Sequence, residues 1–426
     1  MATENPRVWF KSISLENVRS FGEKQTINFT DKDGNAARWN VILGDNGTGK
    51  TTVLRGLCWS VDHKFESAKF PRNSNYLKRN SFNSKPYLCV KLQNFDLDFV
   101  TEAILKTDLL YGSVYPLMSP MGDMRDGEIS PSLFAYGAGR KIGSGGVAQE
   151  EVSRAISLFD EEASLINAEE WLIQADYLRL KDPKTYEKGF TTVHKIIKTL
   201  FREEGSGIMF DTNSGVPKVR LATHYGLIPL HELSLGYKTL IAWMVDFAKG
   251  LLDRYPDSPN PLAEPAVCLV DEIDLHLHPK FQRTIIKFLT DTFPSTQFIV
   301  TAHSPLIVIA AEERPLDANI ILLKREGDQT VVVNDPVDVT NWSVDQVLNS
   351  DLFGHVPSRS EPLTALRTER DSLLAKSKLT RKNSVRLAEL DEQIGFIPFG
   401  QDQAEIKAET IIQQLADVLR KQKQAQ

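Results

Sequence analysis

The sequence has 426 residues and a formal net charge of −6 at pH 7, with 41% hydrophobic and 25% charged residues. This composition is typical of a soluble globular protein of roughly two or three domains; the acidic balance argues against a surface that is basic throughout but allows a local basic strip. Residues 1–10 lack the apolar core of a signal peptide, no apolar run approaches membrane-spanning length, and the three cysteines follow no pairing pattern. We therefore expect a cytoplasmic protein with reduced thiols and no membrane contact.

The N-terminal segment predicts a strand-rich unit that leads into a phosphate-binding loop. Alternating apolar residues at 13–18 and 25–29 predict a hairpin, and the apolar run 39–43 predicts a buried strand before a helix over 51–59. Between that strand and that helix lies a stretch fitting G-x-x-x-x-G-K-[ST], namely Gly44, Asp45, Asn46, Gly47, Thr48, Gly49, Lys50, Thr51 and Thr52. A strand, a glycine-rich loop and a helix in this order define a nucleotide-phosphate site.

The residue types in this loop suit a nucleoside triphosphate that is bound with Mg²⁺. Glycines let backbone N–H groups close around phosphate oxygens, and the helix that follows adds the partial positive charge of its N-terminus. Lys50 is expected to reach the β- and γ-phosphates, and the Thr51 hydroxyl is expected to hold Mg²⁺. ATP and Mg²⁺ are therefore the expected ligands.

The chain from the P-loop to residue 205 divides into a first lobe and a helical insertion. Residues 66–85 form a polar, basic stretch that we expect to be exposed, and residues 111–131 are expected to be a loop. Strands are expected at 87–92, 97–105 and 133–136. After residue 149 the apolar spacing becomes helical, with a second helix over about 186–201, which predicts an insertion at 150–205.

A second anion site is predicted beyond the insertion, after a strand pair at 207–210 and 218–222. The stretch 231–238 places a serine and a glycine at the start of an apolar helix, where backbone N–H groups and the helix dipole favour an anion. The candidate ligand-binding residues of this stretch are Ser234, Gly236 and Lys238.

An apolar run that ends in two acids predicts the catalytic edge of the sheet. Residues 266–270 have the continuous apolar character of a strand buried on both faces, and such a strand delivers Asp271 and Glu272 at its carboxyl end. Asp271 is expected to bind Mg²⁺, and Glu272 is expected to polarise the water that attacks the γ-phosphate. A solvated acidic pair after a strand is the alternative.

Two further polar segments follow this strand. His276 and His278 are one residue apart, but the sequence shows no third ligand near them, so a turn that sets a helix over 280–291 and lies against a partner subunit is favoured over a metal site. The buried run 298–301 leads to His303, which is placed to hydrogen-bond the γ-phosphate and report its presence; a purely structural histidine is the alternative.

These motifs occur in the order found in ABC-type ATPases, over residues 12–305. The opening SLENVRSFGE, the long gap before LSLGYK, and DEIDLHLHP resemble the SMC, RecF and OLD-like branch of that class. LSLGYK departs from the signature of transporter subunits at Leu235 and Tyr237 but keeps Ser234 and Gly236. FAYGAGR and INAEEWL further resemble stand-alone ATPases of bacterial anti-phage systems of the Septu and PARIS types.

The resemblance implies an α/β fold, an ABC-type P-loop ATPase with a helical insertion and a C-terminal helical extension. It also implies a dimer that encloses two nucleotides head to tail, with Asp274 close to the nucleotide. A Q-loop glutamine is not evident in the sequence. Gln93 is one candidate, and the loop 137–140 is another, with Arg140 either touching nucleotide or lying on the surface.

Four regions are therefore expected. They are an ATPase lobe at 1–149, the helical insertion at 150–205, a second ATPase lobe at 206–340 and a helical docking or oligomerisation region at 341–426. Late strands are expected at 320–323 and 330–333, and tail helices at about 361–377, 382–394 and 402–422. In the tail hairpin, Leu363, Leu366, Leu373 and Leu374 are expected to face Val385, Leu387, Leu390 and Ile394.

Only helices are expected beyond the last ATPase strand, so the output is expected to pass through a partner. The favoured role is a homodimer or higher homo-oligomer that senses infection and controls a nuclease or toxin effector. The alternative is a DNA-clamping ATPase of repair or recombination that uses the basic residues of 69–85 and of the tail. DNA or RNA is the nucleic-acid partner considered. A transporter subunit is disfavoured because the insertion is not built like a coupling surface for membrane helices.

Overall fold

The computed structural model describes residues 7–61, 87–95, 99–108, 113–118, 131–143, 154–201, 207–211, 217–224, 226–312, 318–356, 360–375, 380–394, 407 and 411–412. The chain forms two compact units, Met1–His355 and Val356–Gln426. The expected basic stretch at 66–85 and most of the expected helix over 402–422 lie outside the described residues.

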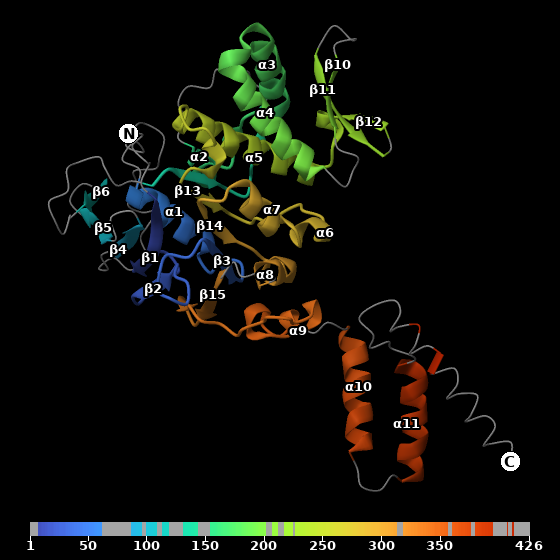
Figure 1. The fold of residues 1–426 in the computed structure, drawn as a ribbon. Coiled ribbons are helices and arrows are strands. Elements are labelled where there is room, and N and C mark those ends of the chain that lie inside the picture. The colour runs from blue at the N-terminus through green and yellow to red at the C-terminus, as the bar shows by residue number, and fades with distance from the viewer. Residues whose placement is uncertain are drawn as a thin grey trace. The chain divides into compact units, whose positions relative to one another are not determined.

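A six-stranded sheet forms the centre of the first unit (Figure 1). In spatial order its strands are β16 (Gln329–Val333), β15 (Asn319–Glu326), β3 (Trp39–Gly44), β14 (Thr296–Thr301), β13 (Ala266–Val270) and β7 (Leu133–Tyr136). All neighbours pair in parallel except β16, which is antiparallel to β15. Because the carboxyl ends of parallel strands meet at one edge, this order brings the ends of β3, β14 and β13 together.

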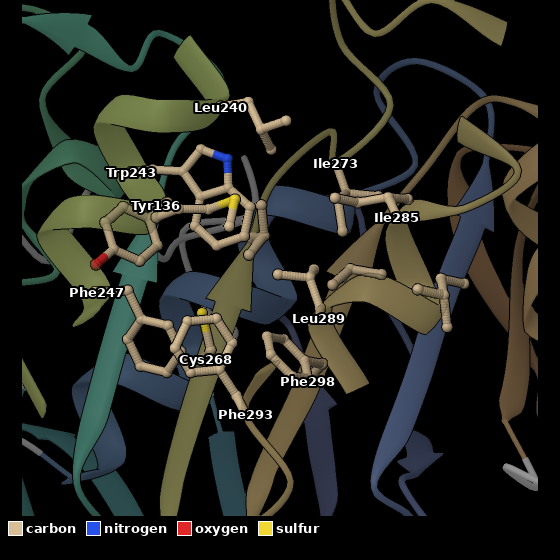
Figure 2. Packing of buried hydrophobic residues seen from close by; sticks show 14 of the residues in the cluster. Tyr136, Leu240, Trp243, Phe247, Cys268, Ile273, Ile285, Leu289, Phe293 and Phe298 are labelled. Carbon is tan, nitrogen blue, oxygen red and sulfur yellow. The ribbon is translucent and has the colours of Figure 1, made fainter. Parts of the chain in front are cut away.

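Alternating side chains on these strands enter two separate cores. On β13, Cys268 and Val270 lie in one cluster while Val267 and Leu269 lie in the other. Helices α5 (Leu235–Arg254), α7 (Ile285–Thr292) and α8 (Pro305–Glu312) contribute to the first cluster, which Figure 2 shows around Cys268. It is aromatic-rich, and burying one such side chain stabilises the fold by about 2 kcal/mol. Helix α1 (Lys50–Val61) contributes to the second cluster.

An antiparallel sheet supplies the rest of the second core. Its spatial order is β2 (Gln25–Asn28), β1 (Val8–Glu16), β4 (Tyr87–Asn94), β5 (Phe99–Asp108) and β6 (Ser113–Met118). The expected hairpin at the N-terminus is thus confirmed.

The expectation of a loop throughout 111–131 is wrong at β6 (Ser113–Met118). The strand carries Pro116, which suggests a loop in sequence, but β6 is an edge strand, where a proline is tolerated because no second neighbour needs its N–H.

Gln297 joins the two sheets inside the protein. Its side chain is fully buried, its Oε1 accepts from the Phe10 N–H at 2.8 Å, and its Nε2 donates to the carbonyls of Phe10 and Ala37 at 2.8 and 2.9 Å. All three peptide groups are thereby satisfied in a region without water access. This link sets the antiparallel sheet against β14 of the central sheet.

The helical insertion packs against α5. Its elements are α2 (Ile156–Phe159), β9 (Ser164–Leu165), α3 (Ala168–Lys181) and α4 (Pro183–Leu200), and β9 pairs with β8 (Lys141–Ile142), which precedes the insertion. The Asn167 side chain caps α3 by accepting from the backbone N–H groups of Glu169 and Glu170. A three-stranded antiparallel sheet of β10 (Gly207–Asp211), β11 (Lys218–Thr223) and β12 (Gly226–Pro229) leads back to the 3₁₀ turn Leu230–Glu232 before α5.

The first unit extends beyond the expected boundary after residue 340. Val339, Val347 and Leu352 are buried in the first core, and they belong to a segment that includes α9 (Val344–Leu348) and the turn Asp351–Phe353. The expected helix over 280–291 is also divided, into α6 (Pro279–Gln282) and α7. Across the described residues, no helix combines the length and the apolar character that crossing a membrane requires.

The second unit contains a pair of helices, α10 (Glu361–Leu374) and α11 (Arg381–Ile394). Leu373 and Leu390 are buried, as the hairpin expectation requires, but Leu374 and Val385 are 50% and 56% exposed, so their expected inward position is wrong. Both lie next to inward-facing positions of their helices, and helical periodicity places them on the outer side. Arg386 pairs with Glu369 through two hydrogen bonds of 2.8 Å, which link the helices.

Candidate nucleotide-binding and hydrolysis site

The P-loop occupies the turn between β3 and α1. Gly47 and Gly49 have φ angles of 81° and 93°, a left-handed conformation that glycine adopts without strain. At Gly49 a Cβ would also lie 2.6 Å from the Ser20 Oγ and 2.8 Å from the Phe21 ring, so the loop is closely packed there. The expected strand, loop and helix are all present, and the loop opens at the N-terminus of α1, where backbone N–H groups favour an anion.

Lys50 is held inside this loop. Only 7% of the residue is exposed, and its Nζ donates to the carbonyl oxygens of Gly44 and Asp45 at 2.7 and 3.0 Å. Burial lowers the pKa of Lys50, while the charges of Asp271 and Glu272 act in the opposite direction. The enclosed ammonium group has carbonyl partners but, within the described ranges, no hydrogen bond to a carboxylate, which is the environment that a phosphate anion would complete.

The expected metal-binding residues meet at the mouth of the loop. The Thr51 hydroxyl donates to Oδ2 of Asp271 at 2.7 Å, and the Thr301 hydroxyl donates to Oδ1 at 2.6 Å. A hydroxyl and a carboxylate are hard oxygen ligands of the kind that Mg²⁺ takes when substrate phosphates and water complete its shell.

The described residues contain no group of three or more His, Cys, Asp and Glu side chains suited to a metal, so His276 and His278 form no such cluster there.

Glu272 stands in a conformation unusual for a side-chain-bearing residue. Its φ is 50°, in the left-handed region, and its backbone N–H donates to the Thr301 hydroxyl at 2.7 Å. Its carbonyl accepts from Nη2 of Arg140 at 2.7 Å. Hydrogen bonds on both sides of this residue thus determine the direction of its side chain.

Arg140 and Gln93, the two candidates for the Q-loop position, have other partners. Arg140 is 4% exposed, and its guanidinium donates to the carbonyls of Gly137, Asp271 and Glu272. Burial lowers its pKa to about 10. Gln93 is buried in β4, accepts from the Ala36 N–H at 2.7 Å and donates to Asn35 at 3.3 Å. Neither surface exposure of Arg140 nor a nucleotide role for Gln93 agrees with these contacts.

The loops that carry Asp274 and His303 are joined to each other. The backbone N–H of His303 donates to Oδ2 of Asp274 at 3.1 Å, while Oδ1 of Asp274 is buried and has no hydrogen-bond partner in the described part of the chain. Gln282 donates to the Asp274 carbonyl at 3.2 Å and accepts from the Ser304 hydroxyl at 2.7 Å. The backbone of His303 is therefore tied to the Asp274 loop, and its imidazole belongs to an exposed residue.

The LSLGYK segment forms the start of α5. Ser234 is the exposed N-cap residue, and its hydroxyl makes no capping hydrogen bond. Lys238 donates from Nζ to the His231 carbonyl at 3.3 Å. Among the described residues, no hydrogen bond or ion pair joins Ser234, Gly236 or Lys238 to the P-loop of the same chain.

Gly236 places the start of α5 against the Asp274 loop. A Cβ at Gly236 would lie 2.1 Å from the carbonyl oxygen of His276. His276 itself has a φ of 61°, so both sides of this contact have a specialised backbone. The two segments are therefore in direct contact within one chain, and only glycine permits that approach.

Several residues that support the site were not identified from sequence. The Thr330 hydroxyl and the Ser20 hydroxyl both donate to the Thr48 carbonyl, at 3.0 and 3.3 Å, from β16 and from the turn after β1. The Thr301 hydroxyl donates to the Asp271 carboxylate and accepts from the backbone N–H of Glu272. A polar side chain at the end of an apolar strand was a sequence signal that could have identified this residue. Thr330 lies 282 residues from Thr48, and no local pattern marks it.

This fold and this arrangement define a P-loop nucleotide-binding protein of the ABC type. Models of AAA-domain families match the chain, one described as "AAA domain" over residues 12–107 and one as "AAA domain, putative AbiEii toxin, Type IV TA system" over residues 194–310. The chain is 30% identical over 353 residues to Septu protein PtuA of Bacillus thuringiensis, covering 75% of this chain and 80% of that protein. It therefore belongs to the Septu PtuA family.

Other relatives match over smaller shares of their length. Septu protein PtuA of Bacillus mycoides (strain KBAB4) is 24% identical over 81% of this chain, but the match spans only 45% of that protein. The Retron Vc95 probable ATPase of Vibrio cholerae serotype O1 biovar El Tor is 51% identical over 81 residues, which are 19% of this chain and 16% of that protein. Among solved structures, the SMC head domain from Thermotoga maritima aligns with a TM-score of 0.43 and 19% identity, over 77% of this chain and 99% of that chain.

The close approach at Gly236 predicts a selective effect of an added methyl group. In Gly236→Ala, the methyl overlaps the His276 carbonyl, so α5 and the Asp274 loop must separate. We expect ATP turnover to fall by about tenfold or more, since small misplacements of catalytic parts carry such losses, while ATP affinity stays close to that of the wild type. Steady-state ATPase rates and equilibrium nucleotide binding measure the two effects.

Gly189→Ala on α4 is the matched control. It is also a helical glycine, but its nearest neighbour to an added Cβ is Leu252 Cδ1 at 3.8 Å. This variant should keep wild-type turnover and unfold at the same or a slightly higher temperature, because alanine favours a helix. Equal turnover in both variants would contradict the proposed importance of the Gly236 contact.

Proposed function

We propose that this chain binds ATP together with Mg²⁺ and hydrolyses it. The observation that carries the proposal is the hydrogen bond between Thr51 of the P-loop and Asp271 at the end of β13, with Lys50 enclosed beside them. These residues come from distant parts of the sequence, and together they supply two oxygen ligands and one cation. The AAA-domain models and the relatives' names support the same activity.

Each side chain has a separate part in the proposed hydrolysis. Lys50 and the P-loop N–H groups would bind the phosphates, while Thr51 and Asp271 would hold Mg²⁺, which would supply positive charge beside the phosphate oxygens. Glu272 orients the attacking water and accepts its proton. His303 donates a hydrogen bond to the γ-phosphate, and its backbone bond to Asp274 passes the presence of that phosphate to the neighbouring loop.

Glu272→Gln tests the assignment of the base. The change keeps the shape of the side chain but removes its ability to accept a proton, so turnover should fall by about 10²–10⁴-fold while ATP still binds. Lys50→Ala should instead weaken ATP binding, because a buried cation that faces the phosphates is lost. Single-turnover hydrolysis and nucleotide titration distinguish the two. Wild-type turnover in Glu272→Gln would exclude Glu272 as the base.

We further propose that each complete site is shared between two copies of the chain. Ser234 opens α5, is exposed, and makes no hydrogen bond to the P-loop of its own chain among the described residues. Its hydroxyl makes no capping hydrogen bond, and together with the N-terminus of a 20-residue helix it forms a candidate anion site. A second chain placed head to tail would present this site to the γ-phosphate.

Mixing two inactive variants tests the shared site. Lys50→Ala damages the P-loop side and Ser234→Arg blocks the opposite side, so each homodimer should be inactive. Mixed dimers contain one doubly damaged site and one intact site, and the mixture should therefore regain part of the ATPase activity. Both variants must be folded and must exchange subunits, which light scattering and a tag-exchange assay establish. If no mixing ratio restores ATPase activity, and if Glu272→Gln chains also fail to dimerise in response to ATP, the shared site is wrong.

The proposed cellular role is that of a sensor ATPase in an anti-phage system, where ATP-dependent dimers control an effector such as a nuclease or toxin. Membership of the Septu PtuA family supports this role. The DNA-clamping alternative receives less support from Arg370 of the tail, because its guanidinium pairs with Asp391 at 3.0 Å. Its other basic stretch, 69–85, and the tail residues Lys376 and Lys378 lie outside the described residues.

The second unit is the proposed docking or oligomerisation element. Leu374 and Val385 are apolar and at least half exposed, which a hairpin in water does not require. Removing residues after His355, where the first unit ends, should preserve ATP binding and reduce the mass of the assembly. Light scattering of the full chain and of the truncated chain, with ATP present, measures this.

Point variants in the full chain provide the control for that truncation. Leu374→Glu combined with Val385→Glu should lower the assembly mass as truncation does, because charges on a buried interface are costly. Leu180→Glu, at a residue of the first unit that is 69% exposed, should leave the mass unchanged. An unchanged mass in both the truncated chain and the double variant would contradict the docking role.

A further inference from the structure

The segment Tyr136–Arg140, within the FAYGAGR motif, joins two functional elements of the same chain. At its first residue, the Tyr136 hydroxyl donates to Oδ2 of Asp246 on α5 at 2.9 Å. The Tyr136 ring is fully buried, and its centroid lies 5.5 Å from that of Trp243, also on α5. Figure 2 shows these two side chains next to each other. The segment is thus anchored to the helix that begins at Ser234.

The last residue of the segment is anchored to the catalytic acids. Nε of Arg140 donates to the Gly137 carbonyl at 2.9 Å, and Nη2 donates to the carbonyl of Glu272 at 2.7 Å and to that of Asp271. Gly137 permits a close approach to α2, because a Cβ there would lie 2.1 Å from the Ser157 carbonyl oxygen. The segment therefore has little freedom to move without breaking these contacts.

The chemistry of Arg140 suits this place better than that of any other side chain. A guanidinium group has several N–H donors in a fixed plane, so one group serves three carbonyls that lie on different sides of it. Among the described residues it makes no hydrogen bond to a carboxylate, while the charges of Asp271, Glu272 and Asp274 act on it in opposition to burial and raise its pKa. A buried cation is thus kept beside the acids without occupying their oxygens.

We propose that Arg140 is a positioning residue for Glu272, and that the segment Tyr136–Arg140 couples α5 to the catalytic acids. This inference rests on the proposed ATP hydrolysis and adds to it the residue that holds the base in place. Glu272 has a φ of 50°, which is unfavourable for a residue with a side chain, so this conformation needs contacts that maintain it. Its N–H is held by Thr301 and its carbonyl by Arg140.

Loss of Arg140 should therefore affect turnover more than binding. Without the guanidinium, the carbonyls of Asp271 and Glu272 lose their donor, and Glu272 can leave the left-handed conformation. The P-loop contacts of Lys50 and Thr51 do not involve Arg140 and should persist. A displaced base with an intact phosphate site lowers kcat and leaves ATP affinity nearly unchanged.

Two variants of Arg140 in the full chain test the inference. Arg140→Lys keeps a cation but has a single terminal nitrogen, and Arg140→Gln places an amide near Nε, where it can reach Gly137 but not the catalytic acids. Both should lower kcat by about 10–100-fold, with ATP affinity within about twofold of wild type. Where one variant unfolds below the assay temperature, the other provides the test. Wild-type kcat in a folded Arg140→Lys would overturn the inference.

Arg38→Lys is the matched control for a buried arginine. Arg38 also donates to three backbone carbonyls, those of Thr290 and Phe293 at 2.8 and 2.7 Å and that of Thr296 at 3.4 Å, but none belongs to the site. Arg38→Lys should lower the melting temperature and leave kcat unchanged. An equal fall of kcat in Arg38→Lys and Arg140→Lys would show that general loss of stability is the cause, and would overturn the positioning role.

A double variant separates positioning from an independent effect. If Arg140 acts through Glu272, adding Arg140→Lys to Glu272→Gln should reduce the residual kcat by less than about twofold. A reduction as large as that in the wild-type background would show that Arg140 acts by another route. Failure of the proposed function gives a different result, because turnover would then be unaffected by Glu272→Gln itself.

Discussion

The hydrogen-bonded chain from Thr51 through Asp271 to Thr301 is the contact on which the site depends. It joins the first turn of α1 to the ends of β13 and β14, with distances of 2.7 and 2.6 Å. The strand order makes this contact possible, because β14 lies between β3 and β13 and all three run in parallel. The P-loop, both acids and the His303 loop are therefore at one edge of the sheet, which is where α/β proteins of this type bind ligands.

The rest of the first unit can be understood as support for that edge. Ser20 and Thr330 hold the outer side of the P-loop through the Thr48 carbonyl, and Gln297 holds the antiparallel sheet against β14. The contacts of Thr330 and Gln297 are buried and that of Ser20 is partly buried, so their peptide groups would be costly to leave unpaired. The polar residues at the back of the site thus determine the geometry of the phosphate-binding face.

Two routes connect this face to α5 within one chain. One passes from Tyr136 to Arg140 along the segment after β7, and the other is the contact between Gly236 and His276. The first ends at Asp246 in the middle of α5, and the second ends at the N-terminus of α5, beside the exposed Ser234. Movement of the phosphate-binding face would therefore reach α5, which carries the surface that we propose to meet a second chain. A nucleotide-dependent dimer requires such a connection.

The second unit has a different physical character. Its two described helices are held by Leu373 and Leu390 and by ion pairs on the surface, such as that between Arg386 and Glu369. Exposed ion pairs of this kind contribute little to stability. A small core and exposed apolar residues such as Leu374 and Val385 agree with an element that completes its packing on another protein.

The sequence by itself determined the local parts of this protein. The P-loop, the apolar strand before Asp271 and the strand before His303 were predicted because each motif lies within about ten residues, where backbone geometry and side-chain pattern act together. The tertiary structure decided the contacts between distant segments. Arg140 meets Asp271 across 131 positions and Thr330 meets Thr48 across 282, and no local pattern encodes such meetings. The contacts of Gln93, the strand β6 and the end of the first unit at His355 could not be predicted for the same reason, because they depend on which neighbours the folded chain places beside them.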